Sequence, residues 1–144
     1  MMFMDTARRT AAWAAVFAYA GAIFYFSSLS HPLPSVFMKF ALFREVEKYH
    51  TDWVIHAVEY AFFGALLIQA IALTFVNRSL AWVAGAAFLA GALYGVSDEW
   101  HQSFVPYRQC SLYDAGADSI GVLTGIFVWM RKHSQKGSVN ACLK

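Results

Sequence analysis

The stretch AAWAAVFAYAGAIFYFSSL, from Ala11 to Leu29, contains 19 residues and no charged side chain. An α-helix rises about 1.5 Å per residue, so a run of this length reaches across a bilayer hydrocarbon core about 30 Å thick. The whole chain has the same character, because its 144 residues are 59% hydrophobic and only 14% charged. Soluble domains are about 25% charged. The sequence therefore predicts an all-α integral membrane protein.

Three further segments are long and apolar enough to cross a membrane, which predicts a four-helix transmembrane bundle in a single domain. The four predicted spans cover residues 11–29, 53–76, 80–97 and 112–130. A basic tail, residues 131–144, follows the last span. Residues 34–49 mix aromatic and charged side chains, which favours a short interfacial helix between the first two spans.

The positions of Lys and Arg predict how the bundle is inserted, because cytoplasmic segments carry the basic excess. Seven of the eleven basic residues precede the first span, lie in the turn at 77–79 or follow the fourth span. Both termini are therefore predicted to be cytoplasmic. Eight of the nine acidic residues fall on the outer side. No basic run is long enough to follow a phosphate backbone, which excludes nucleic-acid binding.

An alternative for the N-terminus is a cleavable signal peptide, because Arg8 and Arg9 precede an apolar stretch that contains Ala18-Tyr19-Ala20. The apolar run continues to Leu29, well past that cleavage point. This continuation favours an anchored helix.

Three of the spans carry a polar end on one helical face. Residues at i, i+4, i+7 and i+11 share a face because the rotation per residue nearly closes over these intervals. The three faces are Asp52/His56/Glu59/Phe63, Gly91/Gly95/Asp98/Gln102 and Asp114/Asp118/Gly121/Gly125. The polar end comes first in the two descending spans and last in the ascending one, so all three should meet on the outer side. The paired glycines have GxxxG spacing, which predicts that the same faces pack against each other.

Two residues are expected to shape the place where the polar ends meet. Glu59 lies seven residues beyond Asp52, roughly 10 Å deeper in the membrane. A carboxylate facing lipid there would cost several kcal/mol, so Glu59 should face the bundle interior. Arg108 follows Pro106, where the chain should turn back. Its guanidinium is then predicted to lie over the place where the acidic helix ends meet. There it suits a carboxylate or phosphate partner.

The residues at this meeting place divide into two groups of candidates. Carboxyl and imidazole groups perform general acid–base chemistry, and the candidate catalytic residues are His56, Glu59, Asp98, His101 and Asp118. The candidate substrate-binding residues are Glu99, Gln102, Arg108, Asp114 and Tyr60. A divalent cation would offset the excess of carboxylates, and the sequence does not choose between Mg²⁺, Mn²⁺ and Zn²⁺.

Several of these residues also have ordinary structural interpretations. Ser111-x-x-Asp114 before an apolar run is a capping box. Glu99 lies about 100° from the Asp98 face and could be a solvated acid, and Tyr60 could be a packing aromatic. The whole set could also form a structural polar network that fixes the helix register. The sequence leaves these alternatives open.

Three motifs together resemble the signature of the VanZ-like family: His56-x-x-Glu59-Tyr60-x-x-Phe63-Gly64, Asp98-Glu99-x-His101-Gln102-x-Phe104-Val105-Pro106-x-Arg108 and Asp114-x-x-x-Asp118-x-x-Gly121. The resemblance implies a small multi-pass protein of the bacterial plasma membrane with a role in the cell envelope. The family is named after a member linked to reduced susceptibility to the glycopeptide teicoplanin. Tyr107 departs from the pattern, because the family often has glycine there, and glycine reaches positive φ easily.

The residues support three functions. The first is a pocket, open to the outer leaflet, that binds or acts on a phosphorylated envelope lipid or wall precursor, with Arg108 as the anion clamp. The second is a transporter with a proton or cation relay, although the cytoplasmic halves of the spans lack ionisable groups. The third is a non-enzymatic membrane partner that docks through its acidic rim and the aromatic loop 104–113. The sequence leaves open whether the protein is an enzyme and whether it forms homo-oligomers.

Overall fold

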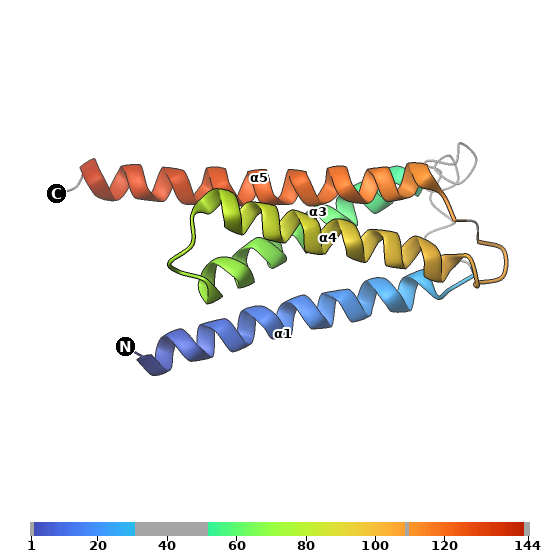
Figure 1. The fold of residues 1–144 in the computed structure, drawn as a ribbon, viewed down its shortest axis with the longest axis horizontal. Helices are drawn as coiled ribbons and strands as arrows, with labels where there is room; N and C mark the ends of the chain where they lie inside the picture. The colour runs from blue at the N-terminus through green and yellow to red at the C-terminus, as the bar shows by residue number, and fades with distance from the viewer. Residues whose placement is uncertain (1, 31–51, 109, 143–144) are drawn as a thin grey trace, which may run out of the picture.

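The computed structural model describes residues 2–30, 52–108 and 110–142, and the regular secondary structure within these ranges is entirely α-helical. Four helices follow one another: α1 (Met2–Ser27), α3 (Asp52–Thr74), α4 (Leu80–Gln102) and α5 (Leu112–Cys142). They run alternately in opposite directions, so both ends of the chain lie at one end of the bundle and the loop after α4 lies at the other (Figure 1). The predicted interfacial helix at 34–49 falls outside the described residues.

The predicted all-helical architecture is confirmed, with longer helices than expected. Three of the helices are long and apolar enough to cross a membrane: α1 from Thr6, α3 from Trp53, and α4. α4 extends five residues beyond the predicted end of its span, and α5 continues to Cys142 through the predicted basic tail. The role of α5 as a fourth span and the cytoplasmic position of the termini stay predictions.

A short turn joins α3 to α4 at the end of the bundle that holds the termini. Ser79 caps α4, since its side-chain oxygen accepts a hydrogen bond from the Trp82 backbone N–H at 3.3 Å. The Trp82 ring also lies 5.2 Å from the Phe75 ring and 5.3 Å from the Arg78 guanidinium carbon. These local contacts hold the two helices antiparallel, which brings the start of α3 close to the end of α4.

Glycines allow α5 to approach α3 closely. Gly121 lies against the backbone carbonyl of Ala57, and Gly125 lies against the carbonyl of Ala61. Gly64 of α3 in turn faces the α5 backbone. Small residues let membrane helices pack backbone to backbone. The prediction that this GxxxG face is a packing face is therefore confirmed.

Replacing Gly125 by alanine should destabilise the bundle by about 1–3 kcal/mol, because the new methyl group would overlap the rigid Ala61 carbonyl. The measurement is thermal unfolding of the purified protein in detergent micelles. Gly85→Ala is the matched control, since nothing lies within 4 Å of a Cβ added there. Equal melting temperatures for the two variants would show that the close approach of α5 to α3 is absent.

α1 is held to the bundle by hydrogen bonds as well as by packing. The Trp13 indole N–H donates to the Thr74 hydroxyl at 2.9 Å, and the Tyr19 hydroxyl donates to the Glu59 backbone carbonyl at 3.2 Å. Ile23 is almost completely buried. The helix is continuous through 18–20, the signal-like tripeptide. α1 thereby forms one wall of the region where the polar helix ends meet.

Candidate functional site

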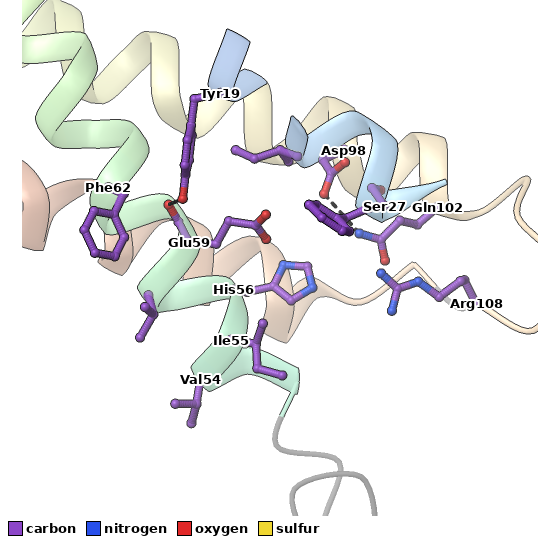
Figure 2. Close-up of a pocket in the computed structure, with 13 residues that line it drawn as sticks. Tyr19, Ser27, Val54, Ile55, His56, Glu59, Phe62, Asp98, Gln102 and Arg108 are labelled. Atoms are coloured by element: carbon purple, nitrogen blue, oxygen red, sulfur yellow. Dashed lines mark hydrogen bonds between the residues drawn. The ribbon is translucent and has the colours of Figure 1, made fainter. Parts of the chain in front are cut away.

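A cavity of about 500 Å³ opens between α1, α3 and the end of α4, near the loop that follows α4 (Figure 2). Its polar lining consists of Tyr19, Ser27, His56, Glu59, Asp98, Gln102 and Arg108. Its apolar lining consists of Ile23, Phe26, Val54, Ile55, Val58 and Phe62. Pockets for small ligands have volumes of about 300–1,000 Å³. The cavity therefore has the size of a ligand site and a polar as well as an apolar part.

The apolar part of the cavity continues onto the outer surface of the bundle. Val58 is 54% exposed and Phe62 is 62% exposed, and both lie on α3. Phe26 of α1 is also exposed. In a bilayer such exposed apolar side chains face lipid. Exposed apolar side chains of α1 and α3 therefore border this side of the cavity.

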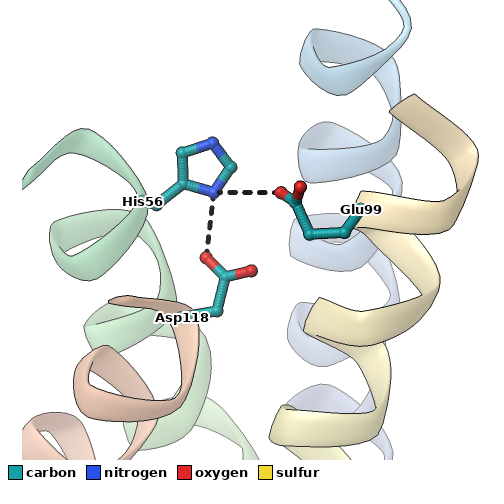
Figure 3. A group of neighbouring side chains, drawn as sticks. All are labelled: His56, Glu99 and Asp118. Carbon is teal, nitrogen blue, oxygen red and sulfur yellow. Dashed lines mark hydrogen bonds and ion pairs between the residues drawn. The ribbon is translucent and has the colours of Figure 1, made fainter. Parts of the chain in front are cut away.

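The polar ends of three helices meet beside this cavity at His56, Glu99 and Asp118 (Figure 3). His56 Nδ1 lies 2.9 Å from Asp118 Oδ1 and 3.9 Å from Glu99 Oε1. His56 comes from α3, Glu99 from α4 and Asp118 from α5, and all three side chains are buried. The polar ends of the three helices therefore converge as expected, but α4 contributes Glu99 to this cluster instead of Asp98 from the predicted face.

Asp118 occupies this position because α4 has a glycine opposite it. A Cβ added to Gly95 would lie 2.9 Å from the Cβ of Asp118, closer than two side chains pack. Asp118 is completely buried, and one of its oxygens bonds His56. A bulkier residue at position 95 would therefore displace the carboxylate from His56.

Glu99 is fixed by the start of α5. The Ser111 backbone N–H donates to Glu99 Oε2 at 2.8 Å, while Ser111 Oγ accepts from the Asp114 N–H at 3.3 Å. In the predicted capping box, the hydrogen bond from the Asp114 N–H to Ser111 Oγ therefore forms. The Ser111 N–H is bonded by Glu99 instead of by the Asp114 side chain. Glu99 is 3% exposed. The interpretation of Glu99 as a solvated acid is wrong, because the loop after α4 folds back over it.

Asp98, Gln102 and Arg108 lie together where the cavity reaches the loop after α4 (Figure 2). Gln102 Nε2 donates to Asp98 Oδ2 at 3.0 Å, and both side chains are buried. Arg108 is half-buried and its guanidinium points into the cavity. Glu59 and His56 point toward the same space. The structure thus brings five of the ten predicted site residues to one cavity.

Six buried side-chain atoms within the described residues have no hydrogen-bond partner: Ser27 Oγ, Tyr60 OH, Asp98 Oδ1, Glu99 Oε1, Arg108 Nε and Asp118 Oδ2. They belong to the cavity lining, to the group of His56, Glu99 and Asp118, which we call the His56 cluster, or to the next turn of α3. An unpaired buried polar atom costs about 1–3 kcal/mol. A network built only to fix the helix register would pair these atoms, so their clustering favours a ligand-binding role.

His101 does not line the cavity that contains His56. Its Nε2 lies 3.0 Å from Ser28 Oγ, and its ring stacks on Phe24 with the ring centroids 4.4 Å apart. His101 and Asp98 line a second hollow of about 420 Å³ between α1 and α4. His101 therefore faces α1. It lies on a different side of α4 from the side that faces the His56 cluster.

Two predicted substrate-binding residues, Tyr60 and Asp114, lie outside both the cavity lining and the cluster of His56, Glu99 and Asp118. Tyr60 is completely buried, and its ring centroid lies 6.0 Å from that of Phe63 and 6.4 Å from that of Tyr94. The packing interpretation of Tyr60 therefore fits the structure. Asp114 is half-buried at the start of α5, where its backbone N–H bonds Ser111.

None of the predicted site residues lies on α1, although α1 forms part of the cavity. Tyr19, Ile23, Phe26 and Ser27 all line it. Their spacing of four, three and one residues places them on one side of the helix. Tyr19 and Ser27, two polar residues eight positions apart in an apolar span, were the available signal. Without a charge among them, this face resembled ordinary membrane-spanning sequence.

Tyr107 adopts a positive φ of 66° in the loop that carries Arg108. This left-handed conformation costs a non-glycine residue about 1–2 kcal/mol. Tyr107→Gly should therefore be more stable than Tyr107→Ala by about 1 kcal/mol, measured by thermal unfolding in detergent. Both variants remove the same side chain and its contacts, so their difference isolates the backbone. A less stable glycine variant would contradict the left-handed geometry.

These features define a helical membrane protein with a partly polar, partly apolar cavity at one end of its bundle. The VanZ/LLP1 family model matches residues 6–133, nearly the whole chain. The chain therefore belongs to the VanZ/LLP1 family, as its three motifs indicated. No curated protein and no solved structure matches it.

Proposed function

We propose that the protein binds a phosphorylated envelope lipid, or a lipid-linked wall precursor, in the cavity between α1, α3 and α4. The observation that carries this proposal is the continuity of the cavity. Its apolar side, at Val58 and Phe62, is open toward lipid, and its polar side holds buried atoms without partners. A lipid matches this division, with its chain on the apolar side and its headgroup on the polar side.

Arg108 is the group best suited to hold the phosphate. It is the only permanent cation among the residues that line the cavity, and its Nε has no partner within the described structure. Guanidinium binds phosphate through charge-assisted, often paired hydrogen bonds. In the catalytic form of this proposal, Glu59 transfers protons beside the headgroup.

The proposal places the cavity in the outer leaflet of the bacterial plasma membrane. The predicted spans and the basic excess near the termini predict that the chain ends lie in the cytoplasm. The helix ends that line the cavity, at the end of α1, the start of α3 and the end of α4, lie at the opposite end of the bundle (Figure 1). A role in glycopeptide susceptibility is part of the same proposal.

A transport function receives less support from the interior of the bundle. Between Glu59 and the end that holds the termini, the buried side chains include Phe63, Leu67, Ile68, Ile71, Val122 and Ile126. A proton or cation relay needs ionisable or hydrated groups along its path. The apolar interior in the described residues favours a site that opens on one side only.

The proposal is tested by native mass spectrometry of the purified protein mixed with phosphatidic acid and with diacylglycerol of the same acyl chains. These two lipids differ only in the phosphate group. The wild-type protein should retain at least about ten times more phosphatidic acid, and Arg108→Gln should reduce this preference to less than about threefold.

Arg78→Gln is the matched control, because Arg78 lies in the turn at the opposite end of the bundle, against Trp82. This variant should keep the wild-type preference for phosphatidic acid. Equal retention of the two lipids by the wild-type protein would overturn the proposal. Loss of the preference in Arg78→Gln as well would attribute it to general surface charge rather than to the cavity.

A further inference from the structure

The His56 cluster has the arrangement of a metal site. One nitrogen of His56 and one oxygen each of Glu99 and Asp118 lie within 4.8 Å of one another, and they come from three different helices. Ligand atoms bound to one ion at about 2.0–2.2 Å lie about 3–3.5 Å apart. The separations of 2.9 Å and 3.9 Å from His56 Nδ1 bracket that range. Small side-chain movements would therefore be sufficient to bind an ion.

One unpartnered atom points to a ligand in this cluster. Glu99 Oε1 has no hydrogen-bond partner, and the Glu99 side chain is at least nine-tenths buried. The Ser111 N–H holds the other oxygen of Glu99 and leaves Oε1 turned toward His56 (Figure 3). Hydrogen bonds of this kind orient metal ligands in established sites.

The charge of the cluster supports the same conclusion. Two carboxylates are buried beside one imidazole, and removing such charges from water is unfavourable unless they are paired. A divalent cation would balance both negative charges. It would displace the proton shared by His56 Nδ1 and Asp118 Oδ1, since metal ligands bind in their deprotonated forms.

We propose that His56, Glu99 and Asp118 bind one divalent transition-metal ion. The imidazole nitrogen is the basis for this class, because Mg²⁺ and Ca²⁺ prefer oxygen ligands, whereas Mn²⁺ and Zn²⁺ accept imidazole together with carboxylate. His56 also lines the cavity. On the proposed function, the ion would therefore lie beside the headgroup and reduce the repulsion between the acidic residues and a phosphate. Only this consequence rests on the proposed function.

Mn²⁺ is the probe for the test, because it binds thiolates weakly and the exposed Cys110 will not compete for it. The full-length protein is treated with a chelator in detergent, and bound Mn²⁺ is measured by electron paramagnetic resonance. The wild-type chain should bind one Mn²⁺ with a magnetic coupling to one imidazole nitrogen. Glu99→Gln and Asp118→Asn should each weaken binding about 100-fold or more, since even the loss of an outer hydrogen bond costs 10–100-fold.

Ser119→Ala is the control, because Ser119 follows Asp118 on α5, but its hydroxyl bonds the Ala115 carbonyl and lies outside the cluster. It should change the affinity less than about threefold. The imidazole coupling keeps the proposal testable if a ligand variant fails to fold, because it is measured on the wild-type protein. Absence of Mn²⁺ binding, binding without imidazole coupling, or unchanged binding in both ligand variants would overturn the proposal.

The metal test uses no added lipid, so it can fail independently of the proposed function. Mn²⁺ binding without a preference for phosphatidic acid would retain the metal site and overturn the lipid proposal. A preference for phosphatidic acid without Mn²⁺ binding would retain the lipid proposal and overturn the metal site.

Discussion

Val58→Trp should lower the amount of phosphatidic acid retained by the purified protein at least about tenfold. Val58 lines the apolar part of the cavity and is 54% exposed on α3. An indole at this position fills the space between α1 and α3 that the proposed lipid chain occupies. The bundle should stay folded, because an exposed apolar position has room for a larger side chain. Native mass spectrometry measures the bound lipid, and thermal unfolding checks the fold.

Val96→Trp is the control for this prediction. Val96 lies six residues before the end of α4, as Val58 lies six residues after the start of α3, and its exposure is similar at 58%. It does not line the cavity. The control should retain lipid like the wild-type protein. Equal retention by Val58→Trp would contradict the lateral entry of the lipid chain between α1 and α3.

His56→Leu should reduce the free energy of unfolding by about 3 kcal/mol in the presence of chelator. The substitution removes the hydrogen-bond partner of Asp118, which is completely buried. Breaking a buried ion pair by removing one partner costs about 3–5 kcal/mol, because the remaining charge is left uncompensated. Unfolding of the detergent-solubilised protein by sodium dodecyl sulfate measures the effect.

The double variant His56→Leu/Asp118→Asn separates loss of the pair from loss of packing. Asn at position 118 removes the buried charge, so the double variant should recover at least about half of the stability lost in His56→Leu. If the two substitutions add as independent losses, the energetic coupling between His56 and Asp118 is absent. The 2.9 Å contact would then contribute little to stability.

The spacing of residues along each helix was enough to predict that three polar ends meet. His56, Asp98 and Asp118 each lie on a face that also carries the small or aromatic residues of the packing interface. Helical geometry fixes which residues share a face. The position of the polar residues in the sequence shows at which end of each span they lie. Because neighbouring spans run in opposite directions, the three polar ends were expected on the same side of the membrane.

The direction from which each neighbouring helix approaches did not follow from the sequence. Glu99 and His101 lie on either side of Asp98 around α4, and nothing in their spacing shows which one faces the other helices. In the structure α5 covers Glu99, while His101 faces α1. These placements depend on the glycines that draw α5 toward α3 and α4. They are a property of the packed bundle rather than of one helix.

Enrichment of phosphorylated lipid at Phe62 tests the central claim most directly. Benzoylphenylalanine is placed at Phe62, which lines the cavity, or at Ile120 of α5, which does not, and the protein is irradiated in vesicles of phosphatidic acid and diacylglycerol. The two positions are 62% and 63% exposed. Adducts at position 62 should be enriched in phosphatidic acid at least about fivefold over those at position 120. The same lipid composition at both positions would contradict a cavity that selects a phosphorylated lipid.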